Sequence, residues 1–341
     1  MKKLSIAQLD KFFAAIAAKE TLYIPADNNG KQAQFQKWEE GVELTKELNT
    51  VRSAKDFFFP QTENLVDFKV NGGKEIEVID NRTESEDFVI FGARACDVRS
   101  FAILDKVFLA QPIDTYYQSR REHGTIIALA CNQPEETCFC QTFGIDATQP
   151  EGDIAAWMTE DAVYFNAQSE KGEALLAAIS DLLTDADDTA VEAQKQQTKE
   201  ILAKLPLAKL NTEYFEGKHQ LDFFNSDKWK ELSESCLGCG TCTFVCPTCQ
   251  CYDIRDFNTG KGIKRFRCWD SCMYSEFTKM AHGNNRISQL ERFRQRFMHK
   301  LVYFPMNNNG EYGCVGCGRC LQKCPISMNI VKVMKTLGGE K

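Results

Sequence analysis

The sequence predicts an α+β protein in which an N-terminal α/β domain precedes a cysteine-rich domain. Three observations support this fold class. Short apolar runs alternate with helical segments in the first 150 residues, a stretch without clear periodicity follows near residue 206, and a cysteine-rich motif occurs twice after residue 235. The 341 residues suffice for two domains of ordinary size. We therefore expect an α/β domain over residues 1–205, a linker over 206–230 and a cysteine-rich domain over 231–341.

The first segment, MKKLSIAQLDKFFAAIAAK, is predicted to form an amphipathic helix with Ser5 as its N-cap. Two lysines before an apolar patch also resemble a signal peptide, but Asp10 and Lys11 interrupt that patch. No apolar run approaches the ~20 residues needed to cross a bilayer. We therefore expect a cytoplasmic protein without a transmembrane segment.

Two buried strands are predicted next, in FVIFGAR (88–94) and TIIALAC (125–131). The segment DVRSFAILDKVFL between them has helical spacing, with Asp97 as the expected N-cap. Strand, helix and strand in this order indicate a parallel pair within an α/β layer. Two further helices are expected over 170–205, in EALLAAISDLL and VEAQKQQTKEILAKL.

The strongest feature of the sequence is an internal repeat. CLGCGTCTFVCP (236–247) recurs as CVGCGRCLQKCP (314–325), and both copies read C-x2-C-x2-C-x3-C-P. This is the spacing of bacterial ferredoxin runs that bind [4Fe–4S] clusters. Zinc sites instead use two C-x2-C pairs some distance apart. We therefore expect a bacterial-ferredoxin-like domain with two [4Fe–4S] clusters and a helical insert over 248–312.

In such runs the first three cysteines bind one cluster and the fourth binds the other. The spacing therefore predicts two mixed ligand sets. One cluster is expected to take Cys236, Cys239, Cys242 and Cys324. The other is expected to take Cys314, Cys317, Cys320 and Cys246. Four glycines in the runs are expected to let backbone N–H groups approach the sulfides, namely Gly238, Gly240, Gly316 and Gly318.

The charge of the chain is unevenly distributed. Residues 236–341 carry 16 Lys and Arg against 7 Asp and Glu, whereas the remainder carries 25 against 41. A basic region can bind nucleic acid, but anionic clusters would offset part of this charge. The segment RISQLERFRQRFMHKLVYF is better interpreted as one helix with its arginines on a solvated face. Its expected buried stripe is Ile287, Leu290, Phe293, Phe297 and Leu301. We expect no nucleic-acid binding.

Eight further cysteines lie outside the two runs, in a chain that has 16 in total. In a reducing compartment, cysteines at this density are more often metal ligands than disulfides. Cys96 and Cys131 follow the two predicted strands, and parallel neighbours bring such ends to the same edge of a sheet. With Cys138 and Cys140 they form a set that suits a third cluster, with buried free thiols as the alternative.

The last four cysteines lie between the two runs and are Cys249, Cys251, Cys268 and Cys272. They suit a further cluster, another metal site or a set of buried thiols. Cys268 and Cys272 have the i, i+4 spacing of one helical face, which favours buried thiols.

Several blocks of the sequence together resemble one family. They are GARACDVRSFAILDKVF, CNQPEETCFC, CLGCGTCTFVCPTCQCYDI, WDSCMYSEFTKMAHGNN, ERFRQRFMHK and CVGCGRCLQKCP. The family comprises the iron–sulfur subunits of anaerobic sulfite reductases and the beta subunits of soluble sulfhydrogenases. The blocks occupy about 91–145 and 236–328, in the family's order. G-x-R-x-C-D, C-F-C and W-D-S-C are more specific than the ferredoxin runs, which many redox proteins share.

The resemblance implies a third [4Fe–4S] cluster on the N-terminal cysteine set. It assigns no clear place to Cys268, which argues against a fourth full cluster. It also implies a non-catalytic electron-transfer subunit of a hetero-oligomer. The partners would be an FAD- and NAD(P)H-binding flavoprotein, or ferredoxin, and a terminal sulfite reductase, hydrogenase or heterodisulfide-reductase-like subunit.

The residues agree with a relay role, because the sequence has no G-x-G-x-x-G after a strand, no P-loop and only 4 histidines. We therefore expect no flavin in this chain and no catalytic residues. Two other classes of function remain open. One is a self-contained iron–sulfur reductase with a substrate-binding cluster, and the other is a sensor whose cluster state controls a binding surface.

Overall fold

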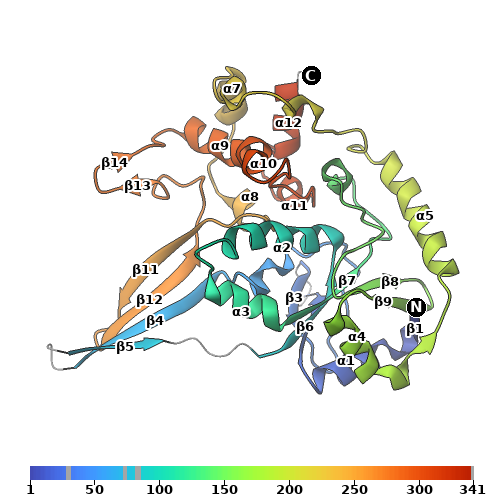
Figure 1. Ribbon diagram of the computed structural model, residues 1–341. Coiled ribbons are helices and arrows are strands. Elements are labelled where there is room, and N and C mark those ends of the chain that lie inside the picture. The colour runs from blue at the N-terminus through green and yellow to red at the C-terminus, as the bar shows by residue number, and fades with distance from the viewer. Residues whose placement is uncertain (28–31, 72–74, 81–85, 339–341) are drawn as a thin grey trace.

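The computed structural model describes residues 1–341 except 28–31, 72–74, 81–85 and 339–341 (Figure 1). Its largest sheet has eight strands in the order β10-β1-β9-β8-β7-β6-β2-β3. Their bounds are β1 (Lys2–Ser5), β2 (Thr21–Ala26), β3 (Gln34–Lys37), β6 (Phe88–Ala93), β7 (Gly124–Leu129), β8 (Ile154–Met158), β9 (Ala162–Ala167) and β10 (Thr184–Asp185). β2, β6, β7 and β8 pair in parallel, as predicted for β6 and β7, and the other pairs are antiparallel.

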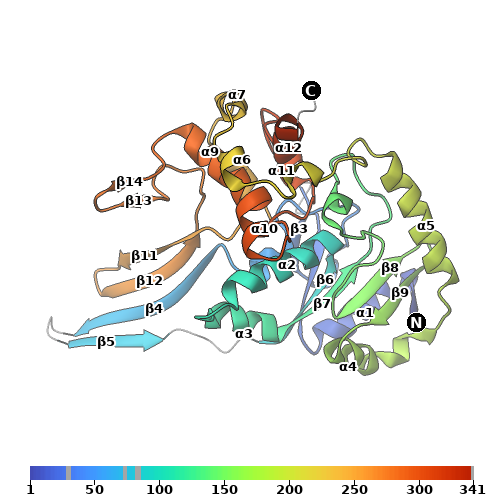
Figure 2. The same cartoon turned by 45° about the horizontal axis from the view of Figure 1, so that its top comes forward.

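Helices cover both faces of this sheet, which explains why β6 and β7 are buried along almost their whole length. One face packs on α1 (Leu9–Ala17) and α4 (Glu170–Ala178). The other packs on α2 (Ala95–Phe108) and α3 (Thr115–His123), which lie between the sheet and the C-terminal part of the chain (Figure 2). The carboxyl ends of β6 and β7 therefore point toward the cysteine-rich region.

Two local predictions for this part are wrong in detail. The chain begins with β1 and a 3-10 turn η1 (Ile6–Gln8), because Leu4 is buried as part of the sheet, and Ser5 makes no capping hydrogen bond. Helix α2 has Arg94 as its N-cap, one turn before the expected residue. Asp97 lies inside the first turn and is buried, since its carboxylate binds a distant arginine described below.

The segment expected to be a linker packs against the C-terminal core. After the short helix η4 (Ser180–Leu182), helix α5 (Thr189–Lys204) leads from the sheet to this segment. The segment forms η5 (Glu213–Phe215) and α6 (Gln220–Phe224), and their aromatic residues Phe215 and Phe223 are buried. The two rings stack with centroids 5.3 Å apart. Residues 206–230 are therefore structured, although their sequence shows no clear period.

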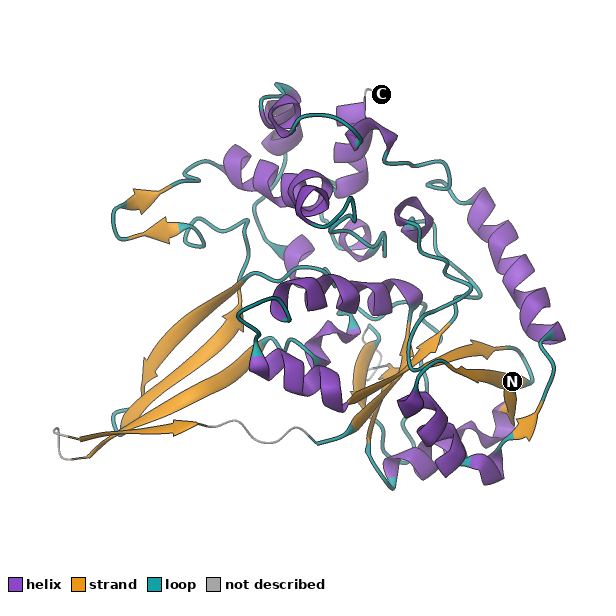
Figure 3. Ribbon diagram, in the orientation of Figure 1, coloured by secondary structure: helices purple, strands orange, loops and turns teal. Residues whose placement is uncertain are grey.

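A second sheet joins the two halves of the chain. Its order is β11-β12-β4-β5, and its strands are β4 (Thr62–Asn71), β5 (Glu75–Asp80), β11 (Tyr252–Asn258) and β12 (Gly262–Trp269). It projects from the side of the molecule, and we call it the side sheet (Figure 3). The insert 248–312 is thus helical only in its second half. Strand β12 pairs with β4 from the N-terminal half, a contact that local sequence patterns do not reveal.

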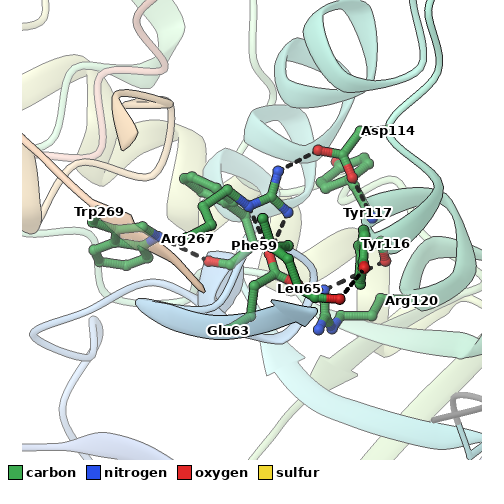
Figure 4. Close-up of polar contacts among 9 residues, drawn as sticks. All are labelled: Phe59, Glu63, Leu65, Asp114, Tyr116, Tyr117, Arg120, Arg267 and Trp269. Carbon is green, nitrogen blue, oxygen red and sulfur yellow. Dashed lines mark hydrogen bonds and ion pairs between the residues drawn. The ribbon is translucent and has the colours of Figure 1, made fainter. Parts of the chain in front are cut away.

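A buried ion network fixes the side sheet to α3 (Figure 4). The Arg267 Nε donates a 2.7 Å hydrogen bond to Glu63, and Arg267 also forms an ion pair with Asp114, the N-cap of α3. On the other side, Arg120 Nη1 lies 2.8 Å from Glu63. The Trp269 indole donates to the Phe59 carbonyl at 3.1 Å. The arginines and carboxylates of this network pair with one another, so they hold the N-terminal and C-terminal halves of the chain together.

The C-terminal part consists of short helices packed around its own core. They are α7 (Lys228–Glu234), α8 (Thr241–Phe244), α9 (Gln289–Met298), α10 (Phe304–Asn307), α11 (Arg319–Gln322) and α12 (Ile330–Gly338). A π-helical segment η6 (His299–Tyr303) joins α9 to α10, and the short hairpin β13 (Lys279–Met280) and β14 (Gly283–Asn284) precedes them. No helix among the described residues is long and apolar enough to span a bilayer.

The predicted long helix exists, with a capping box at Ser288 and Glu291. The structure differs from the predicted buried and solvated faces at one residue of each. Ile287 lies before the helix and is 77% exposed, whereas Arg296 is only 3% exposed. The arginine face is therefore not fully solvated, and the reason lies in the cavities that this helix lines.

Candidate metal centres

Three small cavities are lined by cysteines. They lie in the C-terminal half and where it meets the N-terminal half. The central cavity lies between the second cysteine run and α9. Its cysteines are Cys246, Cys314, Cys317 and Cys320. The outer cavity lies at the first run, and its cysteines are Cys236, Cys239, Cys242 and Cys324. The structure therefore brings together the two mixed sets that the spacing predicts, with the fourth cysteine of each run in the other cavity.

The N-terminal cavity is formed where β6 and β7 end. Cys96 lies in the first turn of α2, Cys131 follows β7, and Cys138 and Cys140 lie in the next loop. All four line one cavity, which also reaches Cys317 of the second run. Each of the three cavities is small and is lined by at least four cysteines.

Close backbone packing joins the N-terminal cavity to the central one. The Phe139 N–H donates a 2.9 Å hydrogen bond to the Gly316 carbonyl. Gly316 has a φ of +59°, and a Cβ there would lie 2.5 Å from the Phe139 carbonyl carbon. A Cβ on Gly318, at φ +78°, would lie 2.6 Å from Thr137 Oγ1. These two glycines are required for the C-F-C loop to seat on the second run, a role in addition to the one expected from the motif.

A buried ion pair spans the same junction. Arg319 of α11 binds Asp97 of α2 through two hydrogen bonds of 2.6 and 3.0 Å, and its Nε donates to the Thr50 carbonyl at 2.9 Å. Both side chains are 1% exposed. Asp97 directly follows Cys96, so the pair fixes the first turn of α2 against the second cysteine run. This explains why the aspartate of G-x-R-x-C-D caps no helix.

Two buried cations line the central cavity. Arg296 and Lys300 lie one helical turn apart, and both are at most 5% exposed. The Arg296 Nη2 donates to the Cys242 carbonyl at 3.1 Å, but its Nε and Nη1 are buried without a hydrogen-bond partner among the described residues. Lys300 donates to Thr248 Oγ1 at 2.7 Å and to the Gly313 carbonyl at 3.0 Å. Unsatisfied buried donors are costly, so these residues fit an anionic group in the cavity.

A third buried cation supports the loop after the first run. Lys55 Nζ donates to the carbonyls of Cys246 and Cys249 at 3.1 and 3.0 Å. It also lies 3.6 Å from the centre of the Trp269 ring. Burial lowers the pKa of this lysine, while the nearby Cys249 and Cys246 oppose that effect. Lys55 thus connects the N-terminal half to the loop that carries one cysteine of the central cavity.

Burial sets the protonation of most of these thiols in the protein alone. It raises the pKa of Cys138, Cys140 and Cys314 to about 12. Two cavity cysteines are exceptions: a hydrogen bond with Thr241 lowers the pKa of the exposed Cys239, and a hydrogen bond with Cys249 lowers the pKa of the buried Cys246. Metals bind thiolates, so a metal group in the buried cavities would displace these protons.

No three His, Cys, Asp or Glu side chains among the described residues converge tightly enough to hold a single metal ion. A cubane places each thiolate on a different iron and therefore needs a wider arrangement than one ion does. The four-cysteine donor sets and the unpartnered Arg296 nitrogens fit a cluster of several iron atoms.

The four insert cysteines lie outside the three sets described above. None of them lines the three cavities. Cys251 interacts with Cys272, and Cys249 interacts with Cys246. Cys268 lies on β12 opposite Asp253, and Cys272 follows in a turn, so the expected shared helical face does not exist. The i, i+4 spacing is misleading because this segment is a strand.

The sequence does not predict the structural roles of Lys55, Arg296, Lys300, Asp97 and Arg319. For two of them a signal was present. Arg296 and Lys300 are four residues apart, one position before Phe297 and Leu301, so they border the apolar stripe of the same helix. Lys55 and the Asp97–Arg319 pair act across the two halves, and no local pattern marks such contacts.

The chain has two ferredoxin-like cavities with four cysteines each, and they follow an α/β domain in the sequence. This combination defines an iron–sulfur protein of the electron-transfer class. The known family that matches residues 235–328 is described as a 4Fe-4S dicluster domain, which confirms the predicted cluster type and the C-terminal fold. No solved structure matches the chain.

The alignment with a characterised relative extends beyond this domain. The chain is 32% identical over 335 residues to sulfhydrogenase 2 subunit beta of Pyrococcus furiosus, covering 97% of this chain and 96% of that protein. The chain therefore belongs to the sulfhydrogenase beta-subunit family, and the resemblance drawn from its motifs is confirmed.

Proposed function

We propose that this chain is the electron-relay subunit of a hetero-oligomeric, cytoplasmic oxidoreductase and holds three [4Fe–4S] clusters in a row. The central and outer cavities would hold the ferredoxin-like pair. Cys96, Cys131, Cys138 and Cys140 would hold the third cluster. When bound, each cluster accepts and releases one electron, and the protein supplies ligands, insulation and electrostatics.

The observation that supports this proposal is the continuity of the three cavities. Gly316 and Cys317 line both the N-terminal and the central cavity. Arg296 lines the central cavity and donates to the backbone of Cys242, which lines the outer one. No catalytic side chain is needed for such a chain of sites.

The outer cavity is the one that reaches the surface. Cys239 is exposed, and Leu237 in the same loop is 67% exposed. Burying an exposed apolar residue beside a cluster favours docking of another protein there. We propose that one redox partner binds at this loop and that the other delivers or collects electrons at the N-terminal end.

The partners we propose are a flavoprotein that oxidises NAD(P)H, or ferredoxin, and a terminal reductase or hydrogenase subunit. The relative is a subunit of a sulfhydrogenase, which supports a hetero-oligomer of this kind. The chain itself would bind no flavin and would leave the chemistry of both ends to its partners.

Iron analysis and reconstitution test the proposal. The anaerobically purified chain should carry about 12 iron and 12 sulfide atoms, accept electrons from dithionite and pass them to viologen dyes. It should not oxidise NADH or NADPH until a flavoprotein is added. A content of about 8 iron atoms would remove the N-terminal cluster, and about 16 would show that the insert cysteines bind one. Bound flavin, or NADH oxidation by the chain alone, would overturn the relay role.

A further inference from the structure

The three cavities differ in the charge of their linings. The central cavity contains two cationic side chains, Arg296 and Lys300, and no carboxylate. The described residues that line the outer and N-terminal cavities include no charged side chain. Near the N-terminal cavity, the charge of Arg319 is balanced by Asp97, and Arg94, which lies outside the lining, donates to the carbonyls of Leu48 and Ala130. The central cavity is therefore set apart by two positive charges within its lining.

These charges are compensated neither by solvent nor by an ion pair. Arg296 is 3% exposed and Lys300 is 5% exposed, and neither forms a salt bridge with any described carboxylate. Burial lowers the pKa of Arg296, but Cys242 and Cys320 outweigh this effect and raise it. A buried charge without a counter-charge is strongly destabilising. The anionic partners that the fold offers are the thiolates of the central cavity, which both cations line, together with Cys242 of the outer cavity beside Arg296.

Reduction adds one negative charge to an iron–sulfur group. A buried cation beside it stabilises the reduced form more than the oxidised form, because charges interact strongly where water is excluded. Nearby charge and hydrogen bonds are among the factors that set the potential of such groups. The two free nitrogens of Arg296 can supply both factors.

We propose that Arg296 and Lys300 give the central site the highest reduction potential of the three, so that the first electron entering the chain resides there. This inference rests on the proposed function, since it requires clusters in all three cavities. The middle of the relay then acts as an electron store between two sites of lower potential. Arg296 and Lys300 are the residues that set this order.

A reductive titration followed by EPR tests the inference on the full-length, iron-loaded chain. The variant Cys246→Ser identifies the central signal, because Cys246 lines the central cavity only. In the wild type the central signal should appear first. In Arg296→Gln the central signal should appear at a lower potential and should no longer appear before the signals of the outer and N-terminal sites. Arg296→Lys, which keeps the charge, should restore much of the order.

Arg294→Gln is the matched control, because Arg294 lies on the same helix and contacts Phe224 instead of a cavity. It should titrate as the wild type does. If Arg296→Gln loses the iron of the central site, the same titration on Lys300→Gln decides. A fully loaded variant with unchanged order and potential would overturn this inference alone, whereas low iron in the wild type would count against the proposed function.

Discussion

The junction between the C-F-C loop and the second cysteine run can be tested with Gly316→Ala. The glycine has a φ of +59°, and its Cβ would lie 2.5 Å from the Phe139 carbonyl carbon and 2.6 Å from the Cys140 nitrogen. All of these are backbone atoms, so no side-chain rotation can relieve the overlap. The loop must move, and the 2.9 Å hydrogen bond from Phe139 to the Gly316 carbonyl is strained or broken.

The expected cost has two parts. A left-handed backbone disfavours an L-residue by about 1–2 kcal/mol. A buried hydrogen-bonding group left without its partner costs a further ~1–3 kcal/mol. The sum predicts a loss of about 2–5 kcal/mol in the free energy of unfolding. Because Cys140 moves with the loop, iron content should also fall by about four atoms per chain.

Gly144→Ala separates the two contributions. Gly144 has a similar φ of +71° and lies in the same segment, but a Cβ on it would meet no atom within 4 Å. It should therefore lose only the backbone part, about 1–2 kcal/mol, and keep its iron. Anaerobic urea unfolding and iron analysis measure both quantities. Equal losses of stability in the two variants, with iron retained in both, would refute the reasoning about close packing.

Two more predictions concern single residues. Cys246→Ser should damage the central site, whose other three cysteines lie about 70 residues later in the sequence, and it should leave the EPR signal of the outer site largely intact. Damage confined to the outer site would contradict the mixed ligand sets. Burial, with help from Lys300 and Arg286, lowers the pKa of His299 to about 4. Below the ordinary histidine pKa of about 6.5 the unfolded chain binds a proton that the folded chain does not, so stability should fall as the pH drops toward 4. His299→Gln should show a smaller difference in urea midpoint between about pH 7.5 and about pH 5 than the wild type, and the exposed His282→Gln should not.

The fold could be predicted from sequence where the signal is local. The apolar runs of β6 and β7 indicate a parallel pair, and the spacing of the two cysteine runs indicates which thiols share a cavity. Predictions are wrong where distant partners decide the structure. Strand β12 falls in a segment expected to be helical, because its partner β4 lies in the other half. The helical pattern places Arg296 in solvent, because its surroundings exist only after the two runs meet α9.

In the candidate site too, local signals could be predicted from the sequence and contacts between distant residues could not. The positions of Cys96 and Cys131 after two strands are enough to expect that they meet, because parallel strands end at one edge. The charges around the sites could not be predicted. Asp97 is a normal N-cap residue by sequence, and only the folded chain brings Arg319 to it. Electrostatics across a junction depends on contacts that a local pattern does not contain.

The pairing of β4 with β12 has a consequence for how the protein is made. About 190 residues separate the two strands, and a ribosome adds about 5–20 residues each second. The edge of β4 that β12 covers thus emerges about 10–40 s before its partner and stays unpaired during that time. Unpaired strand edges are sites of aggregation. Nascent chains arrested before residue 262 should therefore be protease-sensitive at β4, and longer chains should be protected.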